Sequence, residues 1–157
     1  MALEFSPETL AKFERIIARY PKKEAAMLPV LNLAQREFGY IGDEAVAYVA
    51  KLMDQSPAQV LGVVSFYTML NMKPIGRHHI QVCRTLPCAL NGAEKITAFI
   101  KAKLGIEVGQ TTADGRFTLS EVECLASCGT APMMQINDAY YENLTEARVT
   151  EILDSLR

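Results

Sequence analysis

The chain has 157 residues, half of them apolar, and carries a formal net charge of −2. This length suits one ordinary domain or two small ones, and the apolar content is high enough to bury a core, which excludes a disordered chain. No basic patch indicates binding to nucleic acid or to an anionic membrane surface, and no apolar run approaches the roughly 20 residues that a membrane-spanning helix needs. Any role in a membrane process is therefore expected to depend on partner proteins.

The first eight residues lack the basic segment and the apolar segment of a secretory signal. We therefore expect a cytoplasmic protein. Because disulfides are rare in the reducing cytosol, this expectation disfavours disulfide bonds.

The first half of the chain is predicted to be helical, because apolar residues recur three and four positions apart. Four helices are indicated by their end signals. The first helix starts at Ser6 and Pro7 and stops at Pro21, and the second has Pro29 near its start and stops at Gly39. The third starts at Asp43, and the fourth starts with a capping box at residues 56–59. We interpret the apolar stripes as the packing surfaces of a helical bundle.

Residues 73–76 break the helical pattern and are the predicted linker between a helical domain, residues 1–75, and a second domain, residues 76–157. The second domain alternates between strand and helix periods. The expected elements are a strand at 79–82, a helix at 93–104, a strand at 116–123, a hairpin of 133–136 and 139–142 turning at Asn137 and Asp138, and a final helix that begins near Thr145. The predicted fold class is α+β, with an N-terminal helical bundle followed by a domain whose element order is compatible with a thioredoxin-like sheet flanked by helices.

All four cysteines lie in two close pairs. Cys83 and Cys88 follow the first predicted strand, and Cys124 and Cys128 follow the second. Because ligands gather beyond the carboxyl ends of parallel strands, we expect the two pairs to meet at one edge of the sheet.

Four thiols in this pattern have three interpretations: two disulfides, one zinc ion, or an iron–sulfur cluster. Four thiolates suit a structural zinc site, but zinc-binding knuckles usually have two intervening residues, whereas the gaps here are four and three. Longer loops can wrap a larger anion whose sulfurs need N–H donors. The spacing favours an iron–sulfur cluster and leaves zinc as the alternative.

Two other features are interpreted as structural. His78 and His79 are the only histidines, and we expect them to be solvated or hydrogen-bonded rather than iron ligands, because four cysteines already complete a set. Asp114 and Gly115 form a turn that leads into a strand.

The sequence resembles the thioredoxin-like [2Fe-2S] ferredoxin family, and within it the small iron–sulfur subunits of complex I-type NADH:quinone oxidoreductases. The resemblance covers about residues 24–157 and rests on the two cysteine pairs together with residues 62–69, 112–119 and 131–138. It implies one [2Fe-2S] cluster, with Cys83 and Cys88 on one iron and Cys124 and Cys128 on the other. It also implies a partner flavoprotein that binds FMN and NADH, further complex I subunits, and a place in the peripheral arm of a membrane-bound complex.

The function that the resemblance implies is transfer of single electrons between the cluster and the partner's FMN, within an enzyme complex but without catalytic residues on this chain. Two alternatives remain: a similar diaphorase subunit of an NAD-linked hydrogenase or formate dehydrogenase, and an interaction module with a structural zinc. The chain departs from the family at Ala126, where glycine is common. Since a left-handed alanine costs about 1 kcal/mol, we expect an ordinary negative φ at this position.

Overall fold

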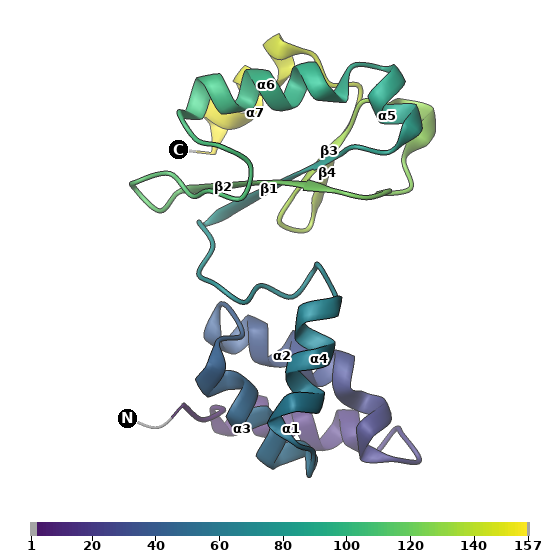
Figure 1. The fold of residues 1–157 in the computed structure, drawn as a ribbon, viewed down its shortest axis with the longest axis vertical. Coiled ribbons are helices and arrows are strands. Elements are labelled where there is room, and N and C mark those ends of the chain that lie inside the picture. Colours follow the sequence, from purple (N-terminus) through teal and green to yellow (C-terminus); the bar gives the residue numbers. More distant parts are fainter. Residues whose placement is uncertain (1–2, 157) are drawn as a thin grey trace. The chain divides into compact units, whose positions relative to one another are not determined.

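The computed structural model describes residues 3–156. The chain divides into two compact units between Pro74 and Ile75 (Figure 1). Each unit has its own hydrophobic core, so the units are described separately.

Unit 1 is helical. Its elements are α1 (Pro7–Ile17), the 3-10 helix η1 (Lys23–Ala26), α2 (Met27–Phe38), α3 (Asp43–Met53) and α4 (Pro57–Phe66). Two of the predicted helix starts are confirmed by their capping hydrogen bonds. The Ser6 side chain accepts from the Thr9 N–H at 3.3 Å, and Ser56 and Gln59 form a complete capping box. Helix α1 is shorter than predicted, because it ends at Ile17 rather than just before Pro21. Pro29 lies in the first turn of α2, where a missing N–H costs no helical hydrogen bond.

The core of unit 1 is formed by apolar residues from α1, α2, α3 and α4. Val30, Leu31 and Val49 are completely buried between the helices. At one end Phe5 stacks on Phe38 with ring centroids 5.4 Å apart, and the Phe5 N–H donates to the Tyr48 hydroxyl at 2.9 Å. The segment before α1 is thereby held against α2 and α3.

Unit 2 is a mixed four-stranded sheet with helices, which confirms the α+β class. Its elements are β1 (His78–Cys83), α5 (Leu86–Leu90), α6 (Ala93–Leu104), β2 (Phe117–Val122), the 3-10 helix η2 (Cys128–Thr130), β3 (Met134–Ile136), β4 (Ala139–Tyr141) and α7 (Glu146–Ser155). The strand order is β2-β1-β3-β4, with β1 and β2 parallel and the other pairs antiparallel. Helices α6 and α7 cover one face of the sheet (Figure 1).

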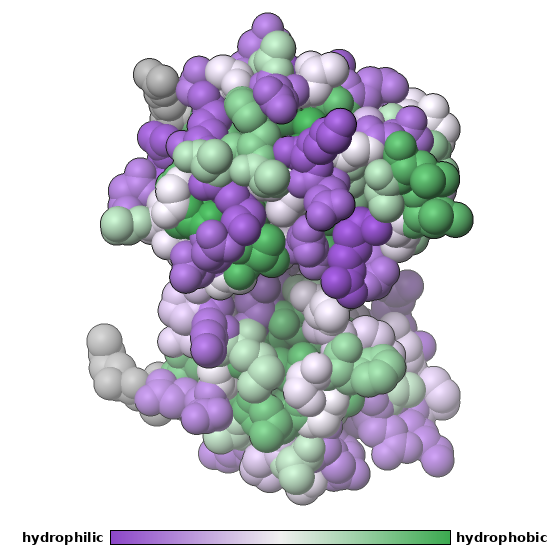
Figure 2. Space-filling view, turned by 45° about the horizontal axis from the view of Figure 1, so that its top comes forward, coloured by the Kyte–Doolittle hydropathy of each residue, from purple (hydrophilic) through white to green (hydrophobic). Residues whose placement is uncertain are grey.

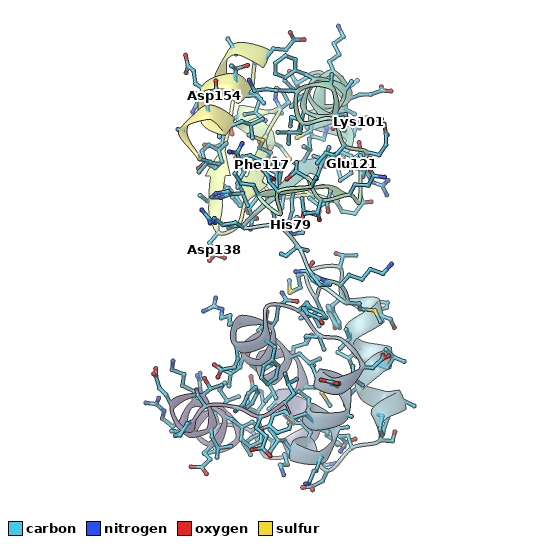
Figure 3. The ribbon with its side chains drawn as sticks, turned by 90° about the vertical axis from the view of Figure 1, so that its left-hand side faces the viewer. His79, Lys101, Phe117, Glu121, Asp138 and Asp154 are labelled. Carbon is cyan, nitrogen blue, oxygen red and sulfur yellow. The ribbon has the colours of Figure 1, made fainter. Side chains whose placement is uncertain are left out.

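The core of unit 2 lies between that sheet face and the two helices. Ile80 and Phe117, on β1 and β2, and Ile100 and Leu153, on α6 and α7, are all 2 % exposed or less. Figure 3 labels Phe117 within this unit. On each strand the fully buried apolar residues stand two positions apart, Ile80 with Val82 on β1 and Phe117 with Leu119 on β2, which is the spacing of one sheet face. Gly76 has a separate role, because a Cβ there would lie 2.9 Å from the backbone of Arg116 and Phe117.

The surface that Figure 2 displays is a mixture of hydrophilic and apolar residues. Among residues 3–156, no helix is both long enough and apolar enough to cross a membrane.

Candidate metal centre

The parallel pairing of β1 and β2 brings the two cysteine loops together. Cys83 is the register partner of Val122, the last residue of β2, and the Arg84 N–H donates to the Val122 carbonyl at 3.0 Å. Cys124 follows Val122 by two residues. Both loops therefore leave the sheet from neighbouring strand ends, as the strand-end argument predicted.

The first cysteine pair is buried. Cys83 is 2 % exposed at the end of β1, and Cys88 is 1 % exposed in the short helix α5. The Thr85 hydroxyl lies 3.3 Å from the Cys83 Sγ, and Thr85 is also the N-cap of α5. Helix α5 replaces part of the loop that the sequence predicts between these two cysteines. The sequence Thr85-Leu86-Pro87 contains the signal for it, an N-cap residue type followed by proline within the first helical turn.

The second pair is exposed, in the loop between β2 and β3. The expectation for Ala126 is wrong: its φ is +60°, in the left-handed region. In this conformation the Ala126 N–H donates to the Cys124 Sγ at 3.3 Å. The loop must turn back within three residues to bring Cys128 towards Cys124, and this requirement outweighs the local preference of alanine.

Glu142 anchors the loop of the second pair from the carboxyl end of β4. Its carboxylate accepts from the Ser127 hydroxyl and, at 2.7 Å, from the Thr130 hydroxyl. These two hydrogen bonds lower the pKa of Glu142 below its ordinary value, Ser127 contributing most. The Asn143 N–H also donates to the Thr130 carbonyl at 2.7 Å. These contacts join residues 12 to 15 positions apart, and no sequence pattern identified them.

An ion pair joins the two cysteine loops. Arg84, next to Cys83, donates to the Glu123 carboxylate from Nη2 at 2.6 Å and from Nε at 3.0 Å, and Glu123 precedes Cys124. Both side chains are more than half exposed, so the pair contributes little to stability. Its position makes it part of the electrostatic surroundings of the thiols.

The four thiols interact as two pairs. Burial raises the pKa of Cys88 to about 11, and its hydrogen-bonded contact with Cys83 acts in the same direction. Desolvation and the neighbouring Cys124 raise the pKa of Cys128. The two pairs also interact electrostatically. Negative charge on Cys83 raises the pKa of Cys88 in its own pair and of Cys128 in the other pair.

Backbone and hydroxyl donors surround Cys83. Although burial works in the opposite direction, hydrogen bonds from the Thr85 hydroxyl and from the Leu125 and Thr85 N–H groups lower the pKa of Cys83 below its ordinary value. The Met133 N–H acts in the same sense on Cys88. Such donors stabilise thiolate ligands and the sulfurs of a cluster.

This donor set fits a binuclear cluster. A [2Fe-2S] centre takes two thiolates on each iron, which matches four free cysteines arranged as two interacting pairs at one sheet edge. Within residues 3–156, no group of three or more His, Cys, Asp or Glu side chains is gathered closely enough for a single metal ion. The cysteines interact as two pairs, and backbone N–H groups donate to the sulfurs of Cys83, Cys88 and Cys124.

His79 lies apart from this centre. It is 9 % exposed, and its Nε2 is 2.8 Å from the Ser120 hydroxyl. Desolvation lowers its pKa. The expectation that it is a hydrogen-bonded structural residue is confirmed. The Asp114 turn is also as predicted, with its carboxylate accepting from the Arg116 N–H at 3.0 Å.

Comparison with known families adds to this geometry. The family model of the thioredoxin-like [2Fe-2S] ferredoxins matches residues 13–157. The chain belongs to this family. The match includes both cysteine pairs and extends the resemblance found in the sequence, which began at about residue 24.

Curated relatives in this family are similar over nearly the whole chain. An NADH-quinone oxidoreductase subunit of Rickettsia conorii is 44 % identical over 156 residues, which cover 98 % of this chain and 93 % of the relative. The mitochondrial NADH dehydrogenase [ubiquinone] flavoprotein 2 of Dictyostelium discoideum is 46 % identical over 157 residues, 98 % of this chain. The chain spans 64 % of the length of this second relative.

A solved structure supports the fold. An NAD+-reducing [NiFe]-hydrogenase in the air-oxidized state superposes with a TM-score of 0.73 over 83 % of this chain and 22 % of the hydrogenase chain, at 22 % identity. At this identity the likeness shows a shared fold.

Proposed function

We propose that this chain is the small electron-transfer subunit of the NADH-oxidising module of an NADH:quinone oxidoreductase. Cys83 and Cys88 hold one iron of a [2Fe-2S] cluster, and Cys124 and Cys128 hold the other. The observation that carries the proposal is the convergence of four free thiols, as two pairs, at the carboxyl ends of two paired strands. The names of the relatives support the choice of complex.

A bound [2Fe-2S] cluster supplies one-electron exchange. The residues of this chain bind and orient it. The N–H groups of Leu125, Ala126 and Met133 are directed at cysteine sulfurs, where they stabilise negative charge. Burial of Cys83 and Cys88 keeps water from one side of the centre, and the exposed Cys124 and Cys128 leave the other side accessible to a partner.

The number of electrons that each cofactor accepts determines which step we assign to this chain and which to its partner. NADH gives up two electrons as hydride, and a flavin can accept both and release them singly. This chain accepts one electron at a time and needs no acid, base or nucleophile. We therefore propose that FMN and NADH bind to a partner flavoprotein in the peripheral arm of the complex, and that residues 76–157 form a thioredoxin-like domain that follows a helical bundle of residues 1–75.

The experiment that tests the proposal compares this chain with and without its flavoprotein partner. Under anaerobic conditions, NADH should bleach the cluster absorbance at a catalytic rate only when the partner is present. Rapid bleaching of the isolated, flavin-free chain would contradict the subunit assignment. If the partner that co-purifies belongs to a hydrogenase or a formate dehydrogenase, the electron-transfer role stands and the complex is the diaphorase alternative.

A further inference from the structure

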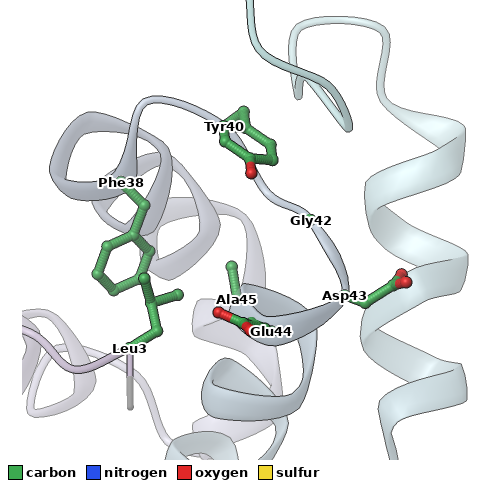
Figure 4. A pocket seen from close by; sticks show the side chains of 7 residues that line it. All are labelled: Leu3, Phe38, Tyr40, Gly42, Asp43, Glu44 and Ala45. Atoms are coloured by element: carbon green, nitrogen blue, oxygen red, sulfur yellow. The ribbon is translucent and has the colours of Figure 1, made fainter. Parts of the chain in front are cut away.

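Two surface hollows in the described part of unit 1 have opposite charge. The first, of about 290 Å³, includes Phe38, Asp43 and Glu44 (Figure 4). Its two carboxylates lie in the first turn of α3, where they complement the helix dipole. This structural role accounts for them, so the acidic hollow requires no ligand.

The second hollow is an apolar groove with a basic rim, here called the α1–α2 groove. It has a volume of about 280 Å³ and is lined by Lys12, Arg15, Ile16 and Arg19 from α1 and the turn after it, and by Leu33 from α2. Ile16 and Leu33 are half-buried and pack against the core of unit 1. The floor of the groove is therefore apolar and supported from below.

The basic rim is only partly neutralised within unit 1: the Glu8 carboxylate acts on Lys12 and Arg15, and the Glu37 carboxylate acts on Lys12. Lys12 pairs with Glu8 at 2.7 Å, one turn earlier on the same face of α1. In the part of the chain that the structure describes, no ion pair involves Arg15 or Arg19. With Glu8 and Glu37 counted against the three cations, the groove retains an excess of one positive charge. The dipole of α1 favours cations at this end, but it does not explain an apolar hollow between them.

We propose that the α1–α2 groove docks an acidic amphipathic segment of a partner subunit in the complex. An apolar side chain of the segment would fill the space over Ile16 and Leu33, and neighbouring carboxylates would pair with Arg15 and Arg19. This is the chemistry of a helix-in-groove interface, in which apolar anchors supply affinity and complementary charge sets orientation and association rate. The proposal rests on the proposed function only for the identity of the complex. The groove itself does not depend on the cluster, because it lies in unit 1 and all four cysteines lie in unit 2.

The test is a charge reversal in the complete chain. The variant Arg15→Glu/Arg19→Glu is compared with Lys51→Glu/Lys73→Glu, which makes the same total charge change at two exposed lysines outside the groove. Affinity for the purified complex from which this chain has been removed is measured at low and at physiological salt. The groove variant should bind at least about tenfold more weakly at low salt and lose most of its salt dependence, whereas the control should change less than about twofold.

Two further measurements keep the result decisive. Circular dichroism checks that unit 1 stays helical, and the neutral variant Arg15→Gln/Arg19→Gln should give an intermediate loss. Equal affinity of the groove and control variants would overturn the proposal.

Light scattering on the isolated chain tests whether a second copy of this chain fills the groove. A dimer that the groove variant dissociates would show that it does, and this result would also overturn the proposal. NADH-dependent cluster reduction reports separately on the proposed function, because a groove variant that still binds at saturating partner should be reduced normally.

Discussion

The backbone N–H of Ala126 donates a hydrogen bond to the Sγ of Cys124 at 3.3 Å, from a left-handed φ of +60°. The loop that bears the second cysteine pair therefore contains a conformation that favours glycine. Alanine is retained there at a cost of about 1 kcal/mol or more.

We expect Ala126→Gly to stabilise the folded chain by up to about 1 kcal/mol, because the relief of left-handed strain exceeds the extra backbone entropy of glycine. Denaturant unfolding measures this change. The control is Ala102→Gly on the exposed face of α6, which has ordinary helical geometry and should lose about 1 kcal/mol. Equal destabilisation by both substitutions would show that Ala126 is not strained.

The Arg84–Glu123 pair should tune the cluster without affecting the fold. We expect Glu123→Gln to raise the reduction potential, because it removes a negative charge beside the thiolates, and Arg84→Gln to lower it. The double variant should return close to the original value. Redox titration followed by electron paramagnetic resonance measures all three, and shifts of the same sign in both single variants would contradict this explanation.

Glu37 should make the stability of unit 1 depend on pH in the acid range. Its carboxylate accepts from the Thr9 hydroxyl at 2.7 Å and from the Ser6 N–H at 3.0 Å, and these bonds lower its pKa below 4.5, Thr9 contributing most. Because the folded pKa is depressed, the stabilisation is present above pH 4.5 and is lost as the pH falls through the folded value. Melting temperatures of Glu37→Gln should therefore fall less steeply than those of the original chain below pH 4.5; parallel curves would show that Glu37 has no such role.

Gly76 should be required where the chain enters β1. An added Cβ would lie 2.9 Å from backbone atoms of Arg116 and Phe117, so Gly76→Ala must displace the start of β1 or β2 and should cost about 1–3 kcal/mol. Gly62→Ala is the control, since nothing lies within 4 Å of its added Cβ and alanine favours the α4 helix. Denaturant unfolding compares the two variants. A neutral result at Gly76 would mean that the strands can separate locally at little cost.

Much of the fold was predictable because its signals are local. The capping box at Ser56, the C-terminal Gly39 and the Asn137 turn each act through residues within four positions, and the structure has the corresponding helix ends and hairpin. The position of the cysteine pairs after strands was also visible, because the strand period ends at Cys83.

The details of the centre were less predictable, because they depend on contacts between distant segments. Helix α5 has only five residues, too few for apolar periodicity to identify it. Local preference gave the wrong φ for Ala126, since closing the loop between Cys124 and Cys128 decides that angle. Glu142 holds the loop from across β3 and β4, a relationship that only the folded sheet creates.

The central claim is that Cys83, Cys88, Cys124 and Cys128 together hold one [2Fe-2S] cluster. The most direct test is iron and acid-labile sulfide analysis of the anaerobically purified chain, combined with electron paramagnetic resonance after reduction by dithionite, for the original chain and for the four single Cys→Ser variants. We predict two irons, two sulfides and a one-electron S = 1/2 signal in the original chain, with loss or clear alteration of that signal in every variant, because a hydroxyl is a poorer iron ligand than a thiolate. A colourless chain that contains one zinc ion, or an unchanged signal in any one of the four variants, would contradict the claim.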